Sequence, residues 1–254
     1  MSSATLQSNL SCQLATPCPR LRVVAVVLAA GTASRMGGRP KCLLQREGQT
    51  LLNRLLTALE TAGIDETILV LGHKADLIQA SLSTRVRATL RSPHLPAMQI
   101  HQVLNPQPTD GQNSSLHLGL AKAQSLQAKW LMVALADQPL LDADDLQALI
   151  AAVKTIPADT QMLQPWVENQ PGNPVMLSQK VMSDLLTQAQ QGSISSSSSS
   201  KDLPGGKEWR QHNPQQAHQW ATPNPHYKVD MDTLEDIQAL QTKYGVELTW
   251  DTPI

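Results

Sequence analysis

The feature that most constrains this chain is an uncharged, mostly β-branched run, Val23–Leu28, followed directly by a glycine-rich basic loop. Such a run predicts a strand buried on both faces of a sheet. The 13 residues from Ala29 to Lys41 contain three glycines, three cations and no acid. Glycine lets the backbone approach a ligand closely, and Arg35 and Lys41 place positive charge around it. The pattern favours a phosphate-binding loop at the carboxyl edge of an α/β sheet, although a surface turn with solvated cations also fits.

Two better-known glycine loops do not fit this stretch. A P-loop needs Gly-x4-Gly-Lys-Ser/Thr, whereas Lys41 follows Pro40 and precedes Cys42. A dinucleotide fingerprint needs Gly-x-Gly-x-x-Gly, and Ala33 stands two residues after Gly31. An NAD(P)-dependent oxidoreductase would share the α/β architecture and stays an alternative, although the chain lacks the fingerprint that is usual for that class.

Strand-like and helix-like segments alternate along the chain, which predicts βαβ crossovers and a mostly parallel sheet. Apolar spacing and composition predict helices over Leu51–Ala62, Ala75–Ser83 and Lys180–Gln190, and a last helix with Thr233 as its cap. The same reasoning predicts strands over Thr67–Leu71, Met98–Leu104, Trp130–Ala136, Gln161–Val167, Val175–Leu177 and His226–Asp232. Together these elements predict a three-layer αβα sandwich.

The length and composition of the chain favour one domain. At 254 residues it can bury one large α/β core, which we place over residues 23–250. Residues 1–22 are polar and proline-containing and are expected to form a flexible extension. Residues 192–206 are rich in serine and glycine, so we expect a low-complexity insertion there, either a lid or a tolerated surface loop.

Charge and cysteine content limit the class of partner. Twenty basic against twenty-one acidic side chains argue against nucleic acid or an anionic membrane as the main partner. No apolar run approaches the roughly 20 residues that span a bilayer. Three cysteines without a CxxC pair favour a reduced, cytoplasmic protein.

The acids fall into two kinds. Asp137 ends the uncharged strand Trp130–Ala136, a position suited to holding a cation. Asp142, Asp144 and Asp145 begin a helix, so capping explains them better than metal binding, which stays an alternative.

Asp230 and Asp232 stand two residues apart on the predicted strand, so they share a face and can converge on one cation, or they can be solvated edge acids. We expect the carboxylates of Asp137 and Asp232 to meet at one sheet edge and to repel each other when no metal is bound.

Two further segments have the composition of loops. The composition of Asn105–Gly119 predicts a loop and the start of a helix, with Ser114 or Ser115 as the cap. The composition of Pro171–Val175 predicts an ordinary turn before a strand.

Several of these segments resemble the MobA-like nucleotidyltransferases. Leu28-Ala-Ala-Gly31, Arg35-Met-Gly37 and Lys41 resemble their nucleotide-binding signature, and Gly111, Ser114, Ser115 and Leu116 resemble a second motif. Asp137-Gln-Pro139, Gly172-Asn-Pro174 and Asp230-Met-Asp-Thr-Leu-Glu-Asp236 resemble three more, in the expected order. At the position of Ala33, many members of that family have a small polar residue or glycine. At the position of Leu234, they have proline.

The resemblance implies a Rossmann-like sandwich of the nucleotide-diphospho-sugar transferase type, and it assigns roles to residues. It implies catalytic roles for Arg35, Lys41 and Asp137, and a Mg2+ site at Asp137 and Asp232 with Asp230 in support. It implies acceptor binding by Gly172, Asn173 and Pro174. The nucleotide-binding residues that it implies are Leu28, Ala29, Ala30, Gly31, Arg35, Lys41, Gly111, Ser114, Ser115 and Asp137.

The implied activity is nucleotidyl transfer from an NTP to a phosphorylated acceptor, with release of pyrophosphate. The loop Ala29-Ala30-Gly31 resembles the branch of the molybdenum cofactor cytidylyltransferases (MocA type), which implies CTP and molybdopterin as substrates and a molybdoenzyme or its chaperone as recipient. Guanylyl or cytidyl transfer to another phosphorylated small molecule stays an alternative, as does a nucleotide-binding protein without catalysis.

Overall fold

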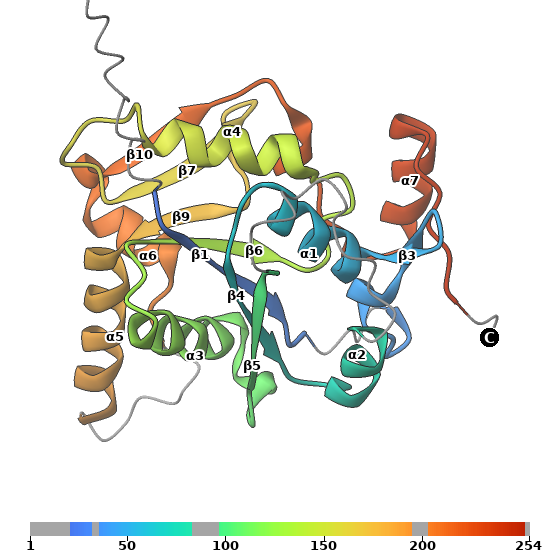
Figure 1. Cartoon of the computed structure of the whole chain (residues 1–254), viewed down its shortest axis with the longest axis horizontal. Coiled ribbons are helices and arrows are strands. Elements are labelled where there is room, and N and C mark those ends of the chain that lie inside the picture. Colours follow the sequence, from blue (N-terminus) through green and yellow to red (C-terminus); the bar gives the residue numbers. More distant parts are fainter. Residues whose placement is uncertain (1–20, 32–35, 83–96, 195–202, 252–254) are drawn as a thin grey trace, which may run out of the picture.

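The computed structural model describes residues 21–31, 36–82, 97–194 and 203–251, and its centre is one eight-stranded sheet (Figure 1). The strand order is β10-β7-β9-β6-β1-β4-β5, and β8 pairs with β7. A separate two-stranded hairpin joins β2 (Gln45–Arg46) to β3 (Gln49–Thr50). The strands of the main sheet are β1 Val23–Ala29, β4 Glu66–Leu71, β5 Gln99–Leu104, β6 Trp130–Leu135, β7 Met162–Val167, β8 Gln170–Pro171, β9 Val175–Ser178 and β10 Ala217–Ala221.

The predicted strand at Val23–Leu28 is the centre of this sheet. β1 pairs in parallel with β4 on one side and with β6 on the other, and β4 continues in parallel to β5. β9 runs antiparallel to both β6 and β7, so the sheet is mixed on one half and parallel on the other. The predicted α/β fold with a mostly parallel sheet is therefore confirmed.

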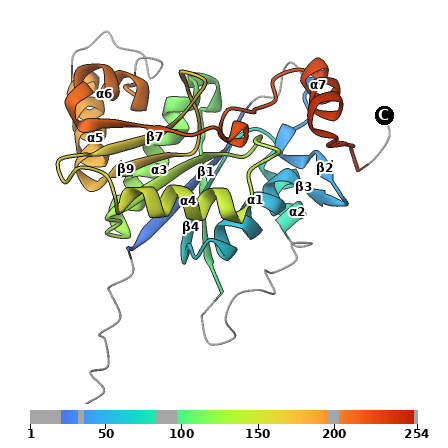
Figure 2. The ribbon, with the colours of Figure 1, turned by 90° about the horizontal axis from the view of Figure 1, so that it is seen from above.

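Helices cover both faces of the sheet, as Figures 1 and 2 show. α1, α2 and α4 lie on one face, and α3, α5 and α6 lie on the other. The side chains of β1 divide between these layers: Val23, Ala25 and Val27 pack with the first group, while Val24 and Val26 pack with the second. The helices are α1 Leu51–Thr61, α2 Ala75–Leu82, α3 Gln112–Ser125, α4 Ala143–Val153, α5 Gln179–Ile194, α6 Gly206–His212 and α7 Leu234–Tyr244.

α7 packs outside the two helix layers, beside the β2–β3 hairpin (Figure 2). Met231 and Leu240 are buried there against Met36, Leu44 and Leu51. This small cluster fixes the residues just before α7 next to the loop that follows β1.

Local capping predictions hold at two helices and fail at a third. Asp142 caps α4 and Thr233 caps α7, each in a reciprocal pair of bonds with the third helical residue. α3 instead has Gly111 at its N-cap, with φ 96°, and no side chain caps it. Ser114 and Ser115 therefore lie inside the first turn of α3, where their hydroxyls are free to serve other contacts.

The predicted strand over His226–Asp232 is wrong. Residues Pro225–Tyr227 form a 3-10 turn, and no strand follows it before α7. Of the alternating apolar side chains, Tyr227 and Met231 are buried and Val229 is partly buried. Tyr227 lies with Leu141, whereas Val229 and Met231 lie in the cluster beside α7. Because the segment packs into two separate clusters, it covers these side chains without a strand partner.

Part of the insertion expected at residues 192–206 lies within the described residues. α5 continues through Ile194, and Leu203–Gly205 contacts α3 before α6 begins at Gly206. Residues 195–202, like the extension 1–20, lie outside the described residues. Among the helices described, none is both long enough and apolar enough to cross a membrane.

Candidate active site

The candidate site begins where β1 and β6 end side by side. Leu28 pairs with Leu135 in the parallel register, and the Ala136 N–H donates to the Leu28 carbonyl at 3.2 Å. Gly31 follows one strand end and Asp137 follows the other. The prediction that both lie at the same sheet edge is therefore confirmed.

A cavity of about 470 Å³, here called the first cavity, opens at this edge. It is lined from five segments of the chain that are far apart in sequence. Its lining residues are Leu28, Ala30, Gly31, Lys41, Pro108, Thr109, Gly111, Gln112, Ser115, Leu135, Asp137, Asp230 and Asp232. Most of the residues that the sequence singled out for nucleotide and metal binding therefore face one space.

Three of those residues do not line the first cavity. Ala29 lines a smaller adjoining hollow of about 60 Å³ with Lys41 and Cys42. Ser114 lies beside the cavity rather than on its lining. Arg35 lies outside the described residues. Burial and the charge of Asp137 raise the pKa of Cys42 to about 12, so this thiol stays protonated and is a poor nucleophile.

Lys41 connects the two aspartates that the sequence assigned to a metal. Its Nζ donates to Asp137 Oδ2 at 3.1 Å, to Asp232 Oδ1 at 2.7 Å and to the Met231 carbonyl at 2.5 Å. Burial alone lowers the pKa of Lys41, but the hydrogen bond to Asp232 and the charge of Asp137 outweigh it and leave that pKa raised.

This arrangement bears on two expectations from the sequence. Lys41 is not one of the solvated cations of a surface turn, because only 19% of its side chain is exposed. Nor do the two carboxylates face each other without a counter-charge, because the ammonium group lies between them. Two carboxylate oxygens that converge on one cation in this way are a donor set that also suits a divalent metal.

Hydrogen bonds at the start of α7 position the backbone of Asp232. Asp236 accepts from the backbone N–H groups of Asp232 at 2.8 Å and Thr233 at 2.7 Å, and these bonds lower the pKa of Asp236. Partial burial and the charges of Asp137 and Asp232 raise the pKa of Asp230. The helix cap thus fixes the backbone that carries Asp232 into the first cavity.

The opposite wall of the first cavity is the N-terminal turn of α3. Asn105, buried at the end of β5, donates to the hydroxyls of Ser114 and Ser115, each at 2.9 Å. Ser114 in turn donates to the Gly111 carbonyl at 2.7 Å. A helix N-terminus directs unpaired N–H groups and positive partial charge toward the cavity, which favours an anionic or polar ligand. Sequence reasoning did not single out Asn105, although it opens the Asn-Pro segment before this motif.

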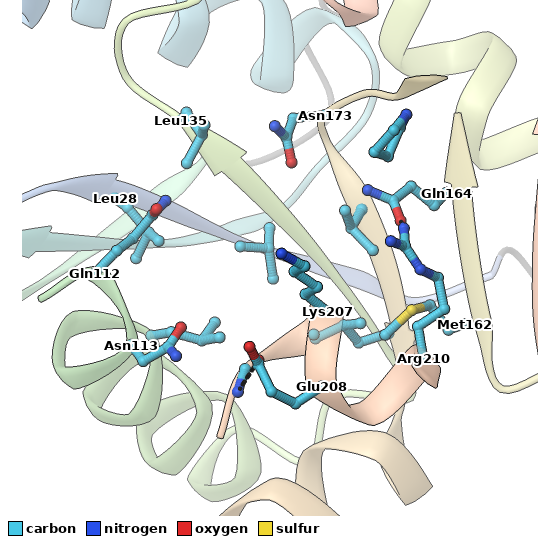
Figure 3. A pocket seen from close by; sticks show the side chains of 17 residues that line it. Leu28, Gln112, Asn113, Leu135, Met162, Gln164, Asn173, Lys207, Glu208 and Arg210 are labelled. Atoms are coloured by element: carbon cyan, nitrogen blue, oxygen red, sulfur yellow. Dashed lines mark hydrogen bonds between the residues drawn. The ribbon is translucent and has the colours of Figure 1, made fainter. Parts of the chain in front are cut away.

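A second cavity, which Figure 3 shows, also has a volume of about 470 Å³ and adjoins the first. The two share Leu28, Gln112 and Leu135. The other lining residues are Asn113, Leu116, Val133, Met162, Gln164, Pro171, Asn173, Val175, Leu177, Gly205, Gly206, Lys207, Glu208 and Arg210.

The segment assigned to the acceptor reaches this second cavity through one residue of three. Asn173 lies on its lining, whereas Gly172 and Pro174 are buried away from it. A Cβ atom added at Gly172 would lie 2.6 Å from the Tyr227 carbonyl oxygen, so this glycine is required for packing. The α6 residues on the lining were not predicted, because nothing in the local sequence 206–212 indicates what lies beside it.

Among the described residues, one group has a spacing that could hold a metal elsewhere: Asp142, Asp145 and His226. Its donor atoms already have partners. Asp142 and Asp145 bond to each other's backbone N–H groups, and Asp145 also accepts from His226 Nδ1 at 2.8 Å and from Asn224 at 2.6 Å. These contacts agree with the capping interpretation.

A family model described as the MobA-like NTP transferase domain matches residues 25–202. The bifunctional protein GlmU of Synechococcus sp. is 30% identical over 142 residues, which is 56% of this chain and 28% of GlmU. The CMP-5′-(3-aminopropyl)phosphonate synthase of Streptomyces rubellomurinus is 36% identical over 95 residues, 36% of this chain and 14% of the synthase. The chain thus spans less than a third of the length of either relative.

Two solved structures share the fold over most of both chains. A nucleotidyl transferase from Methanothermobacter thermautotroptrophicus superposes with a TM-score of 0.64 at 20% identity, over 87% of this chain and 96% of that one. Rv0371c from Mycobacterium tuberculosis, in a complex with manganese, gives a TM-score of 0.57 at 21% identity, over 87% and 99%. These structures support the architecture at the level of fold.

Proposed function

The chain belongs to the MobA-like NTP transferase family, and on that premise we propose that it transfers a nucleotidyl group from CTP to a phosphorylated acceptor, with Mg2+. The observation that carries this proposal is the placement of Lys41 between Asp137 and Asp232 inside the first cavity. The cavity contains a lysine and two carboxylates that could hold a metal, and it lies beside a glycine loop and a helix N-terminus. Such a cavity suits a nucleoside triphosphate better than an uncharged ligand.

The triphosphate is proposed to lie against Gly31 and Lys41, with the base toward Ala30 and the start of α3. Asp137 and Asp232 are the residues that would hold Mg2+, with Asp230 close by. When bound, Mg2+ supplies positive charge to phosphate oxygens and so stabilises charge in the transition state. Lys41 exchanges its carboxylate partners for phosphate oxygens as the nucleotide enters, and it then offsets charge on the departing pyrophosphate. Arg35 is proposed to add to this charge.

The reaction needs no nucleophilic side chain from the protein. An oxygen of the acceptor phosphate forms a new bond to the α-phosphorus, and the bond from that phosphorus to the β-phosphate oxygen breaks, releasing pyrophosphate. Because a phosphate is already ionised near pH 7, the acceptor has little need of a general base. The residues 23–250 are proposed to act as one domain in this chemistry.

CTP and molybdopterin are the substrates that we favour. The loop Ala29-Ala30-Gly31 supports CTP through its resemblance to the cytidylyl branch, and the synthase related to this chain carries CMP in its name. In the first cavity Ala30 is backed by Gly72, where an added Cβ atom would approach the Ala30 Cβ to 2.7 Å. The methyl group is thus packed against Gly72 in the wall, with Ala30 only 6% exposed, and we propose that alanine here leaves less room for a purine than glycine would. A molybdoenzyme or its chaperone would receive the product.

The test is release of pyrophosphate. The protein is incubated with Mg2+, each of the four NTPs in turn, and either molybdopterin or another phosphorylated acceptor, with Asp137→Asn as the inactive control. We expect the fastest release with CTP and molybdopterin. Release no faster than that of the control, with every NTP and every acceptor, would refute the proposal.

A further inference from the structure

The second cavity contains a cation that the chemistry above does not use. Lys207 extends from α6 into the open space of this cavity (Figure 3). Within the part of the chain that the structure describes, no carboxylate or other acceptor bonds to its ammonium group. An ammonium group directed into a cavity with an apolar floor is suited to binding an anion.

Arg210 lies one helical turn further on the same face of α6. Its guanidinium group donates to Gln164 Oε1 and stacks on the Trp166 ring, with its central carbon 5.1 Å from the ring centre. These two contacts hold Arg210 at the wall of the cavity. Lys207 thus stands beside a second positive charge, and Glu208 is the one acid of the lining described.

α6 is fixed in place, so the backbone that carries the exposed Lys207 side chain is held beside the cavity. Trp209 is 1% exposed, and its Nε1 donates to Asp184 of α5 at 3.0 Å. Leu203 and Pro204 lie just before α6, and two side chains of α3 donate to their carbonyl groups. Asn113 donates to the Leu203 carbonyl and His117 Nε2 to the Pro204 carbonyl, both at 2.7 Å. The helix is therefore anchored to both α3 and α5.

The rest of the lining indicates the shape of the ligand. The floor is apolar and includes Val133, Val175 and Leu177, while amide side chains stand around the rim. The amides are Gln112, Asn113, Gln164 and Asn173. Gln164 already bonds to Arg210 and to the Gly172 carbonyl, and Asn113 donates to the Leu203 carbonyl. Among the described residues, Gln112 and Asn173 are therefore the amides of the lining left for a ligand. An apolar floor with these amide groups suits a flat heterocycle that has hydrogen-bonding atoms.

We propose that the second cavity binds the body of an anionic, heterocyclic acceptor and that Lys207 determines specificity for its negative charge. This inference rests on the proposed function, since it takes the second cavity as the acceptor site. The shared residues Leu28, Gln112 and Leu135 join the two cavities, so an acceptor bound by Lys207 can extend toward the nucleotide in the first cavity.

The first test is kinetic. Lys207→Met removes the charge and keeps an unbranched side chain, Lys207→Arg keeps the charge, and Lys129→Met is the control. Lys129 is an exposed lysine just before β6, and it lines neither cavity. We expect Lys207→Met to raise KM for molybdopterin about tenfold or more without changing KM for CTP, and the other two variants to resemble the wild type. An unchanged KM for molybdopterin in Lys207→Met would overturn the inference.

The second test measures binding without turnover, so it stands if transfer fails. Fluorescence titration compares FMN with riboflavin, and pterin-6-carboxylate with pterin, each without and with saturating Mg-CTP. We expect the charged member of at least one pair to bind about tenfold more tightly in the wild type, and this preference to disappear in Lys207→Met but not in Lys129→Met. A preference within the FMN pair would indicate a phosphate ligand, and a preference within the pterin pair would indicate a carboxylate ligand.

Two results overturn the inference here. One is the lack of a charge preference in both pairs, and the other is displacement of the probe by CTP, which would place it in the first cavity. Failure of the protein to bind Mg-CTP at all, measured separately, would instead contradict the proposed function.

Discussion

Lys41 offers the sharpest prediction, because it has a structural role in the empty protein as well as the proposed catalytic one. The perturbation is Lys41→Met, which keeps the length of the side chain and removes its charge. In the variant, the carboxylates of Asp137 and Asp232 stay close together with no cation between them. We therefore expect both lower stability and a new response to metal.

The magnitude follows from exposure. The contact with Asp137 is mostly buried, with 19% and 25% of the two side chains exposed, and a charge-assisted bond of this kind contributes about 1.5–3 kcal/mol. Asp232 is 58% exposed, so its ion pair is screened by solvent and adds about 0–1 kcal/mol. Taking the lower part of the first range, about 1.5–2 kcal/mol, because the site opens to a cavity, we expect a total loss of about 1.5–3 kcal/mol. For a domain of this size that corresponds to a fall in Tm of about 3–12 °C.

The assay is thermal unfolding of the wild type and the variant, each with and without millimolar MgCl2. Mg2+ should raise the Tm of Lys41→Met more than that of the wild type, since in the wild type the ammonium group competes for the same two carboxylates. Lys228→Met is the control, because Lys228 pairs at 3.2 Å with Glu168, whose side chain is 80% exposed, and the expected change is small. An unchanged Tm in Lys41→Met, or an equal effect of Mg2+ on both proteins, would show that the ion pairs do not hold the site together.

Three further predictions concern other residues. Asp137→Asn should abolish transfer and lower Tm, because it leaves Lys41 with one carboxylate. Asp142→Asn should change neither, since asparagine caps a helix about as well as aspartate. Pyrophosphate release and thermal unfolding check both variants, and the reverse pattern would mean that the metal was assigned to the wrong acid. Burial lowers the pKa of His117, although its bond to the Pro204 carbonyl opposes this, so the unfolded chain binds a proton more readily than the folded one. Stability should then fall as pH drops below about 6.5, and His117→Leu should reduce that slope in denaturant titrations at pH 7 and pH 5; equal slopes would contradict the reasoning. Ala30→Gly should narrow the preference for CTP over GTP in a direct competition assay, and a wild type that prefers GTP would refute the assignment of the base.

Features that depend on neighbours in the chain were predictable from the sequence. The strand at Val23–Leu28 was correctly expected to be buried on both faces, because six uncharged residues leave no side chain for solvent. The caps at Asp142 and Thr233 were likewise correct, since a capping residue bonds to N–H groups only two or three positions away. The common edge of Gly31 and Asp137 followed from one rule, that parallel strands end on the same side of a sheet.

The tertiary structure decided the features that depend on which segments meet. The alternation in His226–Asp232 describes burial, and burial is the same whether a side chain faces a strand partner or a separate cluster, so the strand was wrongly predicted. The contacts of Lys41 join residues 96 and 191 positions apart, and they follow from the strand order and from the packing of α7. Lys207 enters a cavity because α6 docks on α3 and α5. A local pattern fixes the backbone through short-range sterics and hydrogen bonds, whereas the partner of a charge is set by long-range packing that no single stretch of sequence contains.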